Sequence, residues 1–244
     1  MQINFYEEFP TKENLEKLRL IKWKTKIFVT AKSKEGFAVL EKQIKKIKKD
    51  TEVAYWPIAP KTYWISPFSK TEDLEKLFSE LNKTKCSLLI DLELPLRENR
   101  ILLIKNIFRL KKNKKIIKDF LERNKSRVTT AEYPFTIPKR VMKWLGLSYE
   151  IGYERNIMWY SSMLPRLLNN IIKKKLNKIE NKNNYSISLG TIATGVLGNE
   201  PILSPEILER DLEFVEKAGF EKVIIFRLGG LNKDYIEGIE KFAK

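Results

Sequence analysis

The chain has 244 residues, of which 43% are hydrophobic and 32% are charged, a composition that indicates a globular protein and excludes a disordered one. Its 47 Lys and Arg residues outnumber its 31 Asp and Glu residues, which gives a formal net charge of +16. One cysteine and no histidine exclude a disulfide within the chain, Ser-His-Asp or Cys-His catalysis, and histidine-dependent metal centres.

Short apolar runs alternate with amphipathic runs along the chain. The predicted strands are residues 3–9, 26–31, 52–58, 86–92, 127–133, 157–161, 185–193 and 222–228. The predicted helices are residues 11–20, 34–49, 71–81, 97–124, 137–145, 164–179, 205–218 and 235–242. Eight such units predict a single (β/α)8 TIM barrel domain over residues 1–244. The main alternative is a doubly wound open sheet, but its glycine-rich first turn is absent from residues 7–10.

Local signals mark several of the helix ends. Ser69 with Glu72 has the S-x-x-E spacing of a capping box before the third helix. Ser204 followed by Pro205 supplies a cap residue and a first-turn proline for the seventh helix. Gly146 follows the fifth helix and is expected to end it.

The positive charge is concentrated in residues 42–49, 105–118 and 173–182, which belong to three different predicted helices. Charge spread around a barrel favours a solvated surface, and nucleic-acid binding stays the less favoured interpretation. No apolar run approaches the roughly 20 residues of a membrane span, so we expect no membrane partner. The first residues lack a signal-peptide pattern, so we expect a cytoplasmic protein.

Barrel enzymes build their active sites from the loops that follow the strands, so polar residues at strand ends are the catalytic candidates. The candidate acids are Glu7 and Glu8 after the first strand, Asp91 and Glu93 after the fourth, and Glu132 after the fifth. Asp91 and Glu93 are two residues apart and share one strand face. If they face the lumen, repulsion and burial raise one pKa and leave a protonated acid beside an ionised partner. If they face outward, or pair with Arg227 or a lysine, they are structural; both interpretations stay open.

Two short motifs carry a resemblance to a known family. The fourth predicted strand ends in Asp91-Leu92-Glu93, and two units later the sixth ends in Met158-Trp159-Tyr160. This combination resembles the family 18 chitinase-like glycoside hydrolases. The resemblance implies that Glu93 is the general acid and Asp91 its orienting partner. It also implies that Tyr160 binds the substrate acetamide, which acts as the nucleophile.

The chain departs from that family's pattern at four positions. Cys86 and Leu89 stand where the strand-four motif has further aspartates. Ser161 follows the strand-six tyrosine in place of an aspartate, and Phe226 lies in the region of the strand-eight tryptophan. An incomplete motif is also what a lost activity would leave behind.

Aromatic residues gather around the end of the third predicted strand. Among them, Tyr55, Trp56 and Trp64 are candidate substrate-binding residues, because flat apolar rings with polar edges stack on sugar faces. The alternative is that these rings pack on one another over the barrel mouth. A self-packed loop of this kind can still line a pocket.

The other side of the predicted barrel mouth offers an anion site. Arg227 and the glycines Gly229 and Gly230 end the eighth strand ahead of a helix, where such barrels commonly bind phosphate. The eighth strand also neighbours the first in a closed barrel, so Arg227 can equally neutralise Glu7.

These patterns predict a carbohydrate-active barrel that uses Glu93 with Asp91 on an oligosaccharide or other small-molecule substrate. Glu132 and Glu7 are possible second carboxylates, and hydrolysis by this route needs neither a metal nor an organic cofactor. The alternatives are a phosphosugar enzyme anchored at residues 227–230, or a barrel that binds a saccharide or anion without catalysis.

Overall fold

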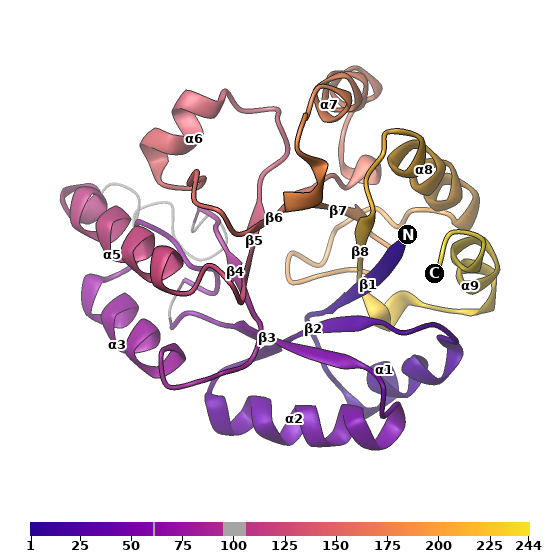
Figure 1. Ribbon diagram of the computed structural model, residues 1–244, viewed down its shortest axis with the longest axis horizontal. Coiled ribbons are helices and arrows are strands. Elements are labelled where there is room, and N and C mark those ends of the chain that lie inside the picture. Colours follow the sequence, from indigo (N-terminus) through magenta and orange to yellow (C-terminus); the bar gives the residue numbers. More distant parts are fainter. Residues whose placement is uncertain (61, 95–105) are drawn as a thin grey trace.

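A computed structural model, which describes residues 1–60, 62–94 and 106–244, shows eight parallel strands closed into a barrel (Figure 1). The strands are β1 (Gln2–Glu7), β2 (Lys26–Ala31), β3 (Glu52–Pro57), β4 (Leu88–Asp91), β5 (Val128–Glu132), β6 (Glu154–Met158), β7 (Tyr185–Gly190) and β8 (Lys222–Phe226). Each strand pairs with the next in the sequence, and β8 closes on β1 with Ile3 opposite Val223. The predicted (β/α)8 fold is therefore confirmed.

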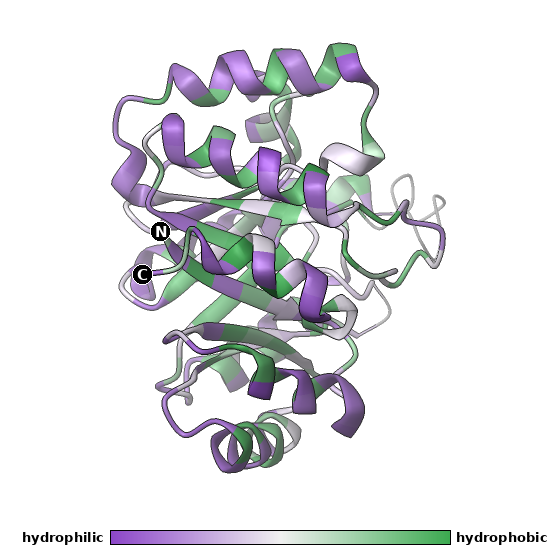
Figure 2. Ribbon diagram, turned by 90° about the vertical axis from the view of Figure 1, so that its right-hand side faces the viewer, coloured by the Kyte–Doolittle hydropathy of each residue, from purple (hydrophilic) through white to green (hydrophobic). Residues whose placement is uncertain are grey.

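The helices surround the barrel (Figure 1). In the described part of the chain they are α1 (Lys12–Glu16), α2 (Lys34–Ile47), α3 (Thr71–Leu81), α5 (Leu110–Arg123), α6 (Lys139–Leu145), α7 (Arg166–Asn177), α8 (Pro205–Lys217) and α9 (Lys233–Glu240). Hydrophilic and hydrophobic residues alternate along them, as expected of helices with one buried stripe (Figure 2). The basic helices α2, α5 and α7 lie on different sides of the barrel. Within the described ranges, no helix is both long enough and apolar enough to cross a membrane.

The helix-end signals were correct at two of three positions. Ser204 caps α8 by accepting a backbone hydrogen bond, and Gly146 ends α6 with a left-handed φ of 72°. The capping box at Ser69 is wrong, because α3 begins after Lys70, which makes no side-chain cap. The buried Ser69 hydroxyl instead lies 3.1 Å from the Thr62 hydroxyl.

Some predicted boundaries also differ from the observed ones. β4 is shorter than residues 86–92, and β6 begins before residue 157 and ends before Tyr160. Of the helix predicted over residues 97–124, residues 97–105 lie outside the described part of the chain. The rest contains a 3-10 turn, Ile107–Arg109, followed by α5.

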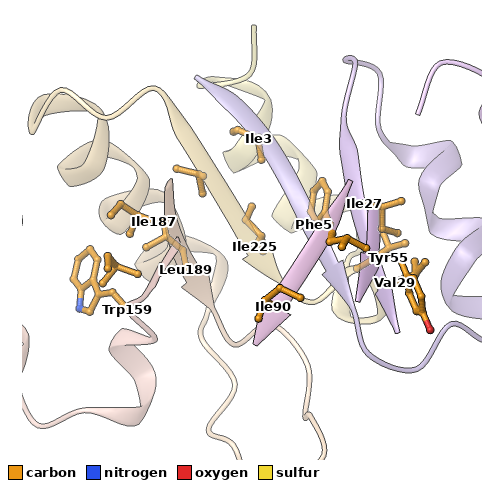
Figure 3. Close-up of a cluster of buried hydrophobic side chains, with 14 of the residues drawn as sticks. Ile3, Phe5, Ile27, Val29, Tyr55, Ile90, Trp159, Ile187, Leu189 and Ile225 are labelled. Atoms are coloured by element: carbon orange, nitrogen blue, oxygen red, sulfur yellow. The ribbon is translucent and has the colours of Figure 1, made fainter. Parts of the chain in front are cut away.

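Successive side chains along each strand point alternately to the helices and to the lumen, so the barrel has two apolar cores. The outer core includes Ile3, Phe5 and Ile225, which pack between sheet and helices (Figure 3). The lumen cluster consists of Tyr6, Phe28, Ala54, Trp56, Leu89, Ala131, Met158, Ile224 and Phe226. The phase of each strand therefore decides which side chains reach the lumen.

Polar side chains fix part of the lumen. Buried Asn156 accepts a hydrogen bond of 2.9 Å from the Tyr6 hydroxyl and another from the Ser188 hydroxyl. Its amide nitrogen donates to the Ser186 hydroxyl at 3.0 Å. Because buried polar groups need partners, this network holds Tyr6 and its neighbours in one arrangement.

Candidate functional site

A cavity of about 360 Å³ opens at the carboxyl ends of the strands, where barrel enzymes place their active sites. Its described lining is Tyr6, Glu8, Trp56, Trp64, Leu89, Asp91, Glu93, Ala131, Tyr133, Pro134, Thr136, Met158, Tyr160, Met163, Leu164, Thr191, Val196, Leu197, Glu200 and Phe226. Acidic and aromatic side chains thus meet in a largely apolar hollow, which is the usual make-up of a small-molecule site.

Asp91 and Glu93 both line this cavity, so the pair faces inward. Asp91 is the last residue of β4 and is 3% exposed. Its Oδ1 is buried and has no hydrogen-bond partner among the described residues. Glu93 Oε2 accepts a hydrogen bond of 3.3 Å from the Tyr133 hydroxyl. Neither carboxyl forms an ion pair within the described ranges, so the outward, structural interpretation does not apply.

Burial raises the pKa of both carboxyl groups. The pKa of Asp91 lies well above its usual value, because its site is desolvated and because Glu93 and Glu8 are nearby. Trp56 acts in the opposite direction through a hydrogen bond. Burial, with a smaller contribution from Glu8, raises the pKa of Glu93 to about 7 against the hydrogen bond from Tyr133. The pair can therefore hold a proton near neutral pH, as a general acid requires.

The aromatic predictions separate into two groups. Trp56, Trp64 and Tyr160 line the cavity, and the Tyr160 ring lies 5.5 Å from that of Phe226. Tyr55 points to the outer face of β3, where its ring stacks on Phe37 of α2 at 4.8 Å. Tyr55 therefore supports the packing of α2 and does not reach the cavity.

Glu7 and Arg227 also face away from the cavity. Arg227 Nη1 lies 3.1 Å from Glu7 Oε1, so Arg227 does neutralise Glu7. The Gly229 amide donates to Glu7 Oε2 at 2.6 Å, and the Phe9 amide donates to Oε1 at 2.7 Å. The Arg227 guanidinium and the Gly229 amide, which a phosphate at residues 227–230 would need as donors, are thus already bound to the carboxylate of Glu7.

Glu132 lies on the outer face of β5. It is 2% exposed, and Arg155 Nε donates to its Oε1 at 2.9 Å. The Thr130 hydroxyl donates to the same oxygen at 3.0 Å. These contacts place Glu132 in a buried ion pair behind the barrel wall, apart from the carboxyl groups in the cavity.

Two further acids reach the cavity: Glu8, a strand-end candidate that was not chosen as a second carboxylate, and Glu200, which was not predicted. Glu8 accepts hydrogen bonds from the Tyr63 hydroxyl at 2.7 Å and from the Val196 amide at 2.9 Å. Glu200, in the loop after β7, accepts one from the Leu197 amide at 3.1 Å. Burial is the main cause that raises the pKa of Glu8 to about 7, and Glu200 adds to it. Glu8 is two residues after Tyr6 and therefore faces the lumen with it, a phase that only the structure reveals. No sequence signal marks Glu200.

Within residues 1–60, 62–94 and 106–244, no three His, Cys, Asp or Glu side chains are arranged to hold a metal ion. The four acids of the cavity, Glu8, Asp91, Glu93 and Glu200, can still act as acid, base or binding groups.

Comparisons with known proteins bear on the fold. No family model and no curated protein matches the sequence. The structure is similar to the C-terminal domain of a protein assigned as a chitinase from Desulfitobacterium hafniense DCB-2, with a TM-score of 0.59 and 12% identity over 99% of this chain and 97% of that one. It is also similar to class V chitinases from Nicotiana tobaccum (TM-score 0.55, 10% identity, 99% and 98% covered) and Pseudomonas fluorescens Pf-5 (0.56, 8%, 100% and 99%).

At such low identities the likeness shows the fold alone: the described part of this chain shares a closed (β/α)8 barrel with these proteins. The expected resemblance to chitinase-like barrels is confirmed at that level. The chemistry of the cavity has to be argued from this chain's own residues.

Proposed function

We propose that this barrel hydrolyses an N-acetylated oligosaccharide, with Glu93 as the general acid. The observation that carries the proposal is that Asp91, Glu93 and Tyr160 line one cavity together with Trp56 and Trp64. The cavity thus combines carboxyl groups able to hold a proton near neutral pH with rings able to stack on sugar faces.

Glu93 is the proton donor in this scheme. Its carboxyl proton passes to the glycosidic oxygen as the bond from that oxygen to the anomeric carbon breaks. In the family that the motifs resemble, the substrate's own acetamide oxygen forms the new bond to the anomeric carbon. Water then opens this intermediate and gives a proton to the Glu93 carboxylate, which restores the acid.

Asp91 is a positioning residue for this step. Its Oδ1 has no hydrogen-bond partner in the described part of the chain, so it is free to accept one from Glu93 or from the substrate N–H. Its raised pKa, caused mainly by burial, lets Asp91 keep a proton while Glu93 gives one up. Tyr160 follows Met158 by two residues on the lumen side and lines the cavity. In this scheme its role is to bind the acetamide group of the substrate.

The test is turnover of chromogenic N-acetylated chito-oligosaccharides by wild type and Glu93→Gln. Losing a general acid is expected to lower kcat by about 10²–10⁴-fold. Glu237→Gln is the matched control, because Glu237 is exposed on α9, and it should leave kcat unchanged. Equal melting temperatures would show that Glu93→Gln still folds. Wild-type turnover by Glu93→Gln would overturn the assignment of the acid.

A second candidate is a barrel that binds the same saccharides without cleaving them. Leu89 favours this candidate. It lies in the lumen at a position where the family that the motifs resemble has an aspartate, so part of that family's catalytic motif is missing here. Wild-type protein that binds N-acetylated oligosaccharides but shows no turnover would support binding without catalysis.

A further inference from the structure

Glu8 and Glu200 form a second acidic pair in the cavity, in addition to Asp91 and Glu93. Both flank Gly195: a Cβ on this glycine would lie 2.8 Å from Glu8 Oε2 and 2.8 Å from Glu200 Oε1. The two carboxylate oxygens therefore lie within twice that distance of each other. Glycine at this position lets the two side chains converge on one point.

Glu200 is the member of the pair whose hydrogen bonding is incomplete. It is 8% exposed and lines the cavity, and its Oε2 has no hydrogen-bond partner among the described residues. A buried carboxylate oxygen without a partner costs free energy, because it has lost its hydration and gained nothing in return. A donor brought by a ligand would remove that cost.

The charge of the cavity contrasts with that of the whole chain. The chain has a formal net charge of +16, yet the described lining contains four acids and neither Lys nor Arg. Arg227, which acts on Glu8 electrostatically, is held by Glu7 and by the Thr194 carbonyl, to which its Nε donates at 2.8 Å. The lining therefore favours a cation as ligand.

An organic ammonium group fits this lining better than a metal ion does. The described acids are not arranged as a metal site, whereas an ammonium group has three N–H donors that can reach two separate carboxylates. Trp64 and Tyr160 line the same cavity, and aromatic faces attract ammonium groups. Since the same rings suit sugar faces, the two preferences together indicate an amino sugar.

We propose that the substrate of this cavity carries a free amine: an amino-sugar oligosaccharide that is partly N-deacetylated, with its ammonium group bound between Glu8 and Glu200. This inference deepens the proposed function and rests on it. Asp91 and Glu93 act on the acetylated sugar, and Glu8 with Glu200 selects a neighbouring sugar that has lost its acetyl group.

The test is calorimetric binding at pH 7, where Glu8 with its pKa of about 7 is partly ionised. Three tetrasaccharides are compared: the glucosamine tetramer, the N-acetylglucosamine tetramer and cellotetraose. Wild type is expected to bind a tetramer containing free amines more tightly than cellotetraose, and added salt should weaken that binding. Glu200→Gln should weaken glucosamine-tetramer binding by about ten- to a hundredfold, as expected for the loss of a charged hydrogen bond. It should change N-acetylglucosamine-tetramer binding less than about twofold.

Glu8→Gln is the second variant, in case Glu200→Gln fails to fold, and Glu237→Gln is the control. Equal weakening of all three tetramers by Glu200→Gln and Glu8→Gln would overturn the inference, as would equal wild-type affinity for the glucosamine tetramer and cellotetraose. Spermidine binding as tight as that of the glucosamine tetramer would overturn the choice of a saccharide. The calorimetric experiment measures binding without turnover, so its result does not depend on the outcome of the Glu93→Gln activity assay.

Discussion

Replacing Glu8 by Gln should make the protein more stable at alkaline pH. Glu8 is 4% exposed, and burial is the largest of the causes that raise its pKa from 4.5 to about 7. The hydrogen bonds from Tyr63 and Val196 offset only part of this effect. Gln has nearly the same shape and keeps a side-chain oxygen that can accept one of these hydrogen bonds, but it never has to ionise.

The sign and size of the effect follow from the pKa difference. Because the pKa of Glu8 is higher in the folded chain than in the unfolded chain, the folded chain binds more protons between pH 4.5 and about 7. Stability therefore falls as the pH rises through this window. At about 1.4 kcal/mol per pH unit, the loss reaches about 3 kcal/mol above pH 7. Glu8→Gln should recover up to that amount at pH 8 and almost none at pH 4.5.

The assay is urea denaturation followed by tryptophan fluorescence at pH 4.5, 6 and 8. Each Glu8→Gln value is compared with wild type at the same pH, since Asp91 and Glu93 add their own pH dependence to both proteins. Glu237→Gln controls for the change in net charge. A difference from wild type that is the same at all three pH values, or a variant that is less stable at pH 8, would refute the reasoning.

Two further predictions concern the general acid and a buried ion pair. With the pKa of Glu93 raised to about 7, kcat/KM for an N-acetylated oligosaccharide should fall about tenfold per pH unit above that value, and a flat profile to pH 9 would contradict its role. Arg155→Met leaves Glu132 buried without its partner, so the free energy of unfolding should fall by about 3–5 kcal/mol. Urea denaturation measures this loss, and adding Glu132→Gln should recover most of it; a loss below about 1 kcal/mol would show that the pair is not structural.

Most of the architecture was predictable from local patterns. The bounds of β2 and α3 were predicted as observed, at residues 26–31 and 71–81, because the spacing of their apolar residues marks both elements, although the cap expected at Ser69 does not form. The predicted bounds of β4 were too long and those of β6 were displaced toward the C-terminus. In both cases the apolar run continues past the last residue that pairs with the neighbouring strand. Pairing across strands, which no local pattern records, decides where a strand ends.

The site was predictable only in part. Asp91, Glu93 and Tyr160 were predicted from short motifs, and the structure brings them to one cavity. Of the two acids at the end of β1, Glu7 was predicted as a possible second catalytic carboxylate. The structure pairs Glu7 with Arg227 and places its neighbour Glu8 in the cavity. Glu200 comes from a loop without regular structure, and its position depends on contacts such as that with the Leu197 amide.

The sequence by itself determined the order of the elements, the closed barrel, and the strand ends at which polar side chains gather. Only the tertiary structure decided which of those side chains face the lumen. The physical reason is that the strands of a closed barrel are buried on both faces, so their apolar runs do not alternate and carry no record of phase. Register across the closed sheet sets that phase, and a change of one residue turns an acid from the cavity to the helices, as Glu7 and Glu8 show.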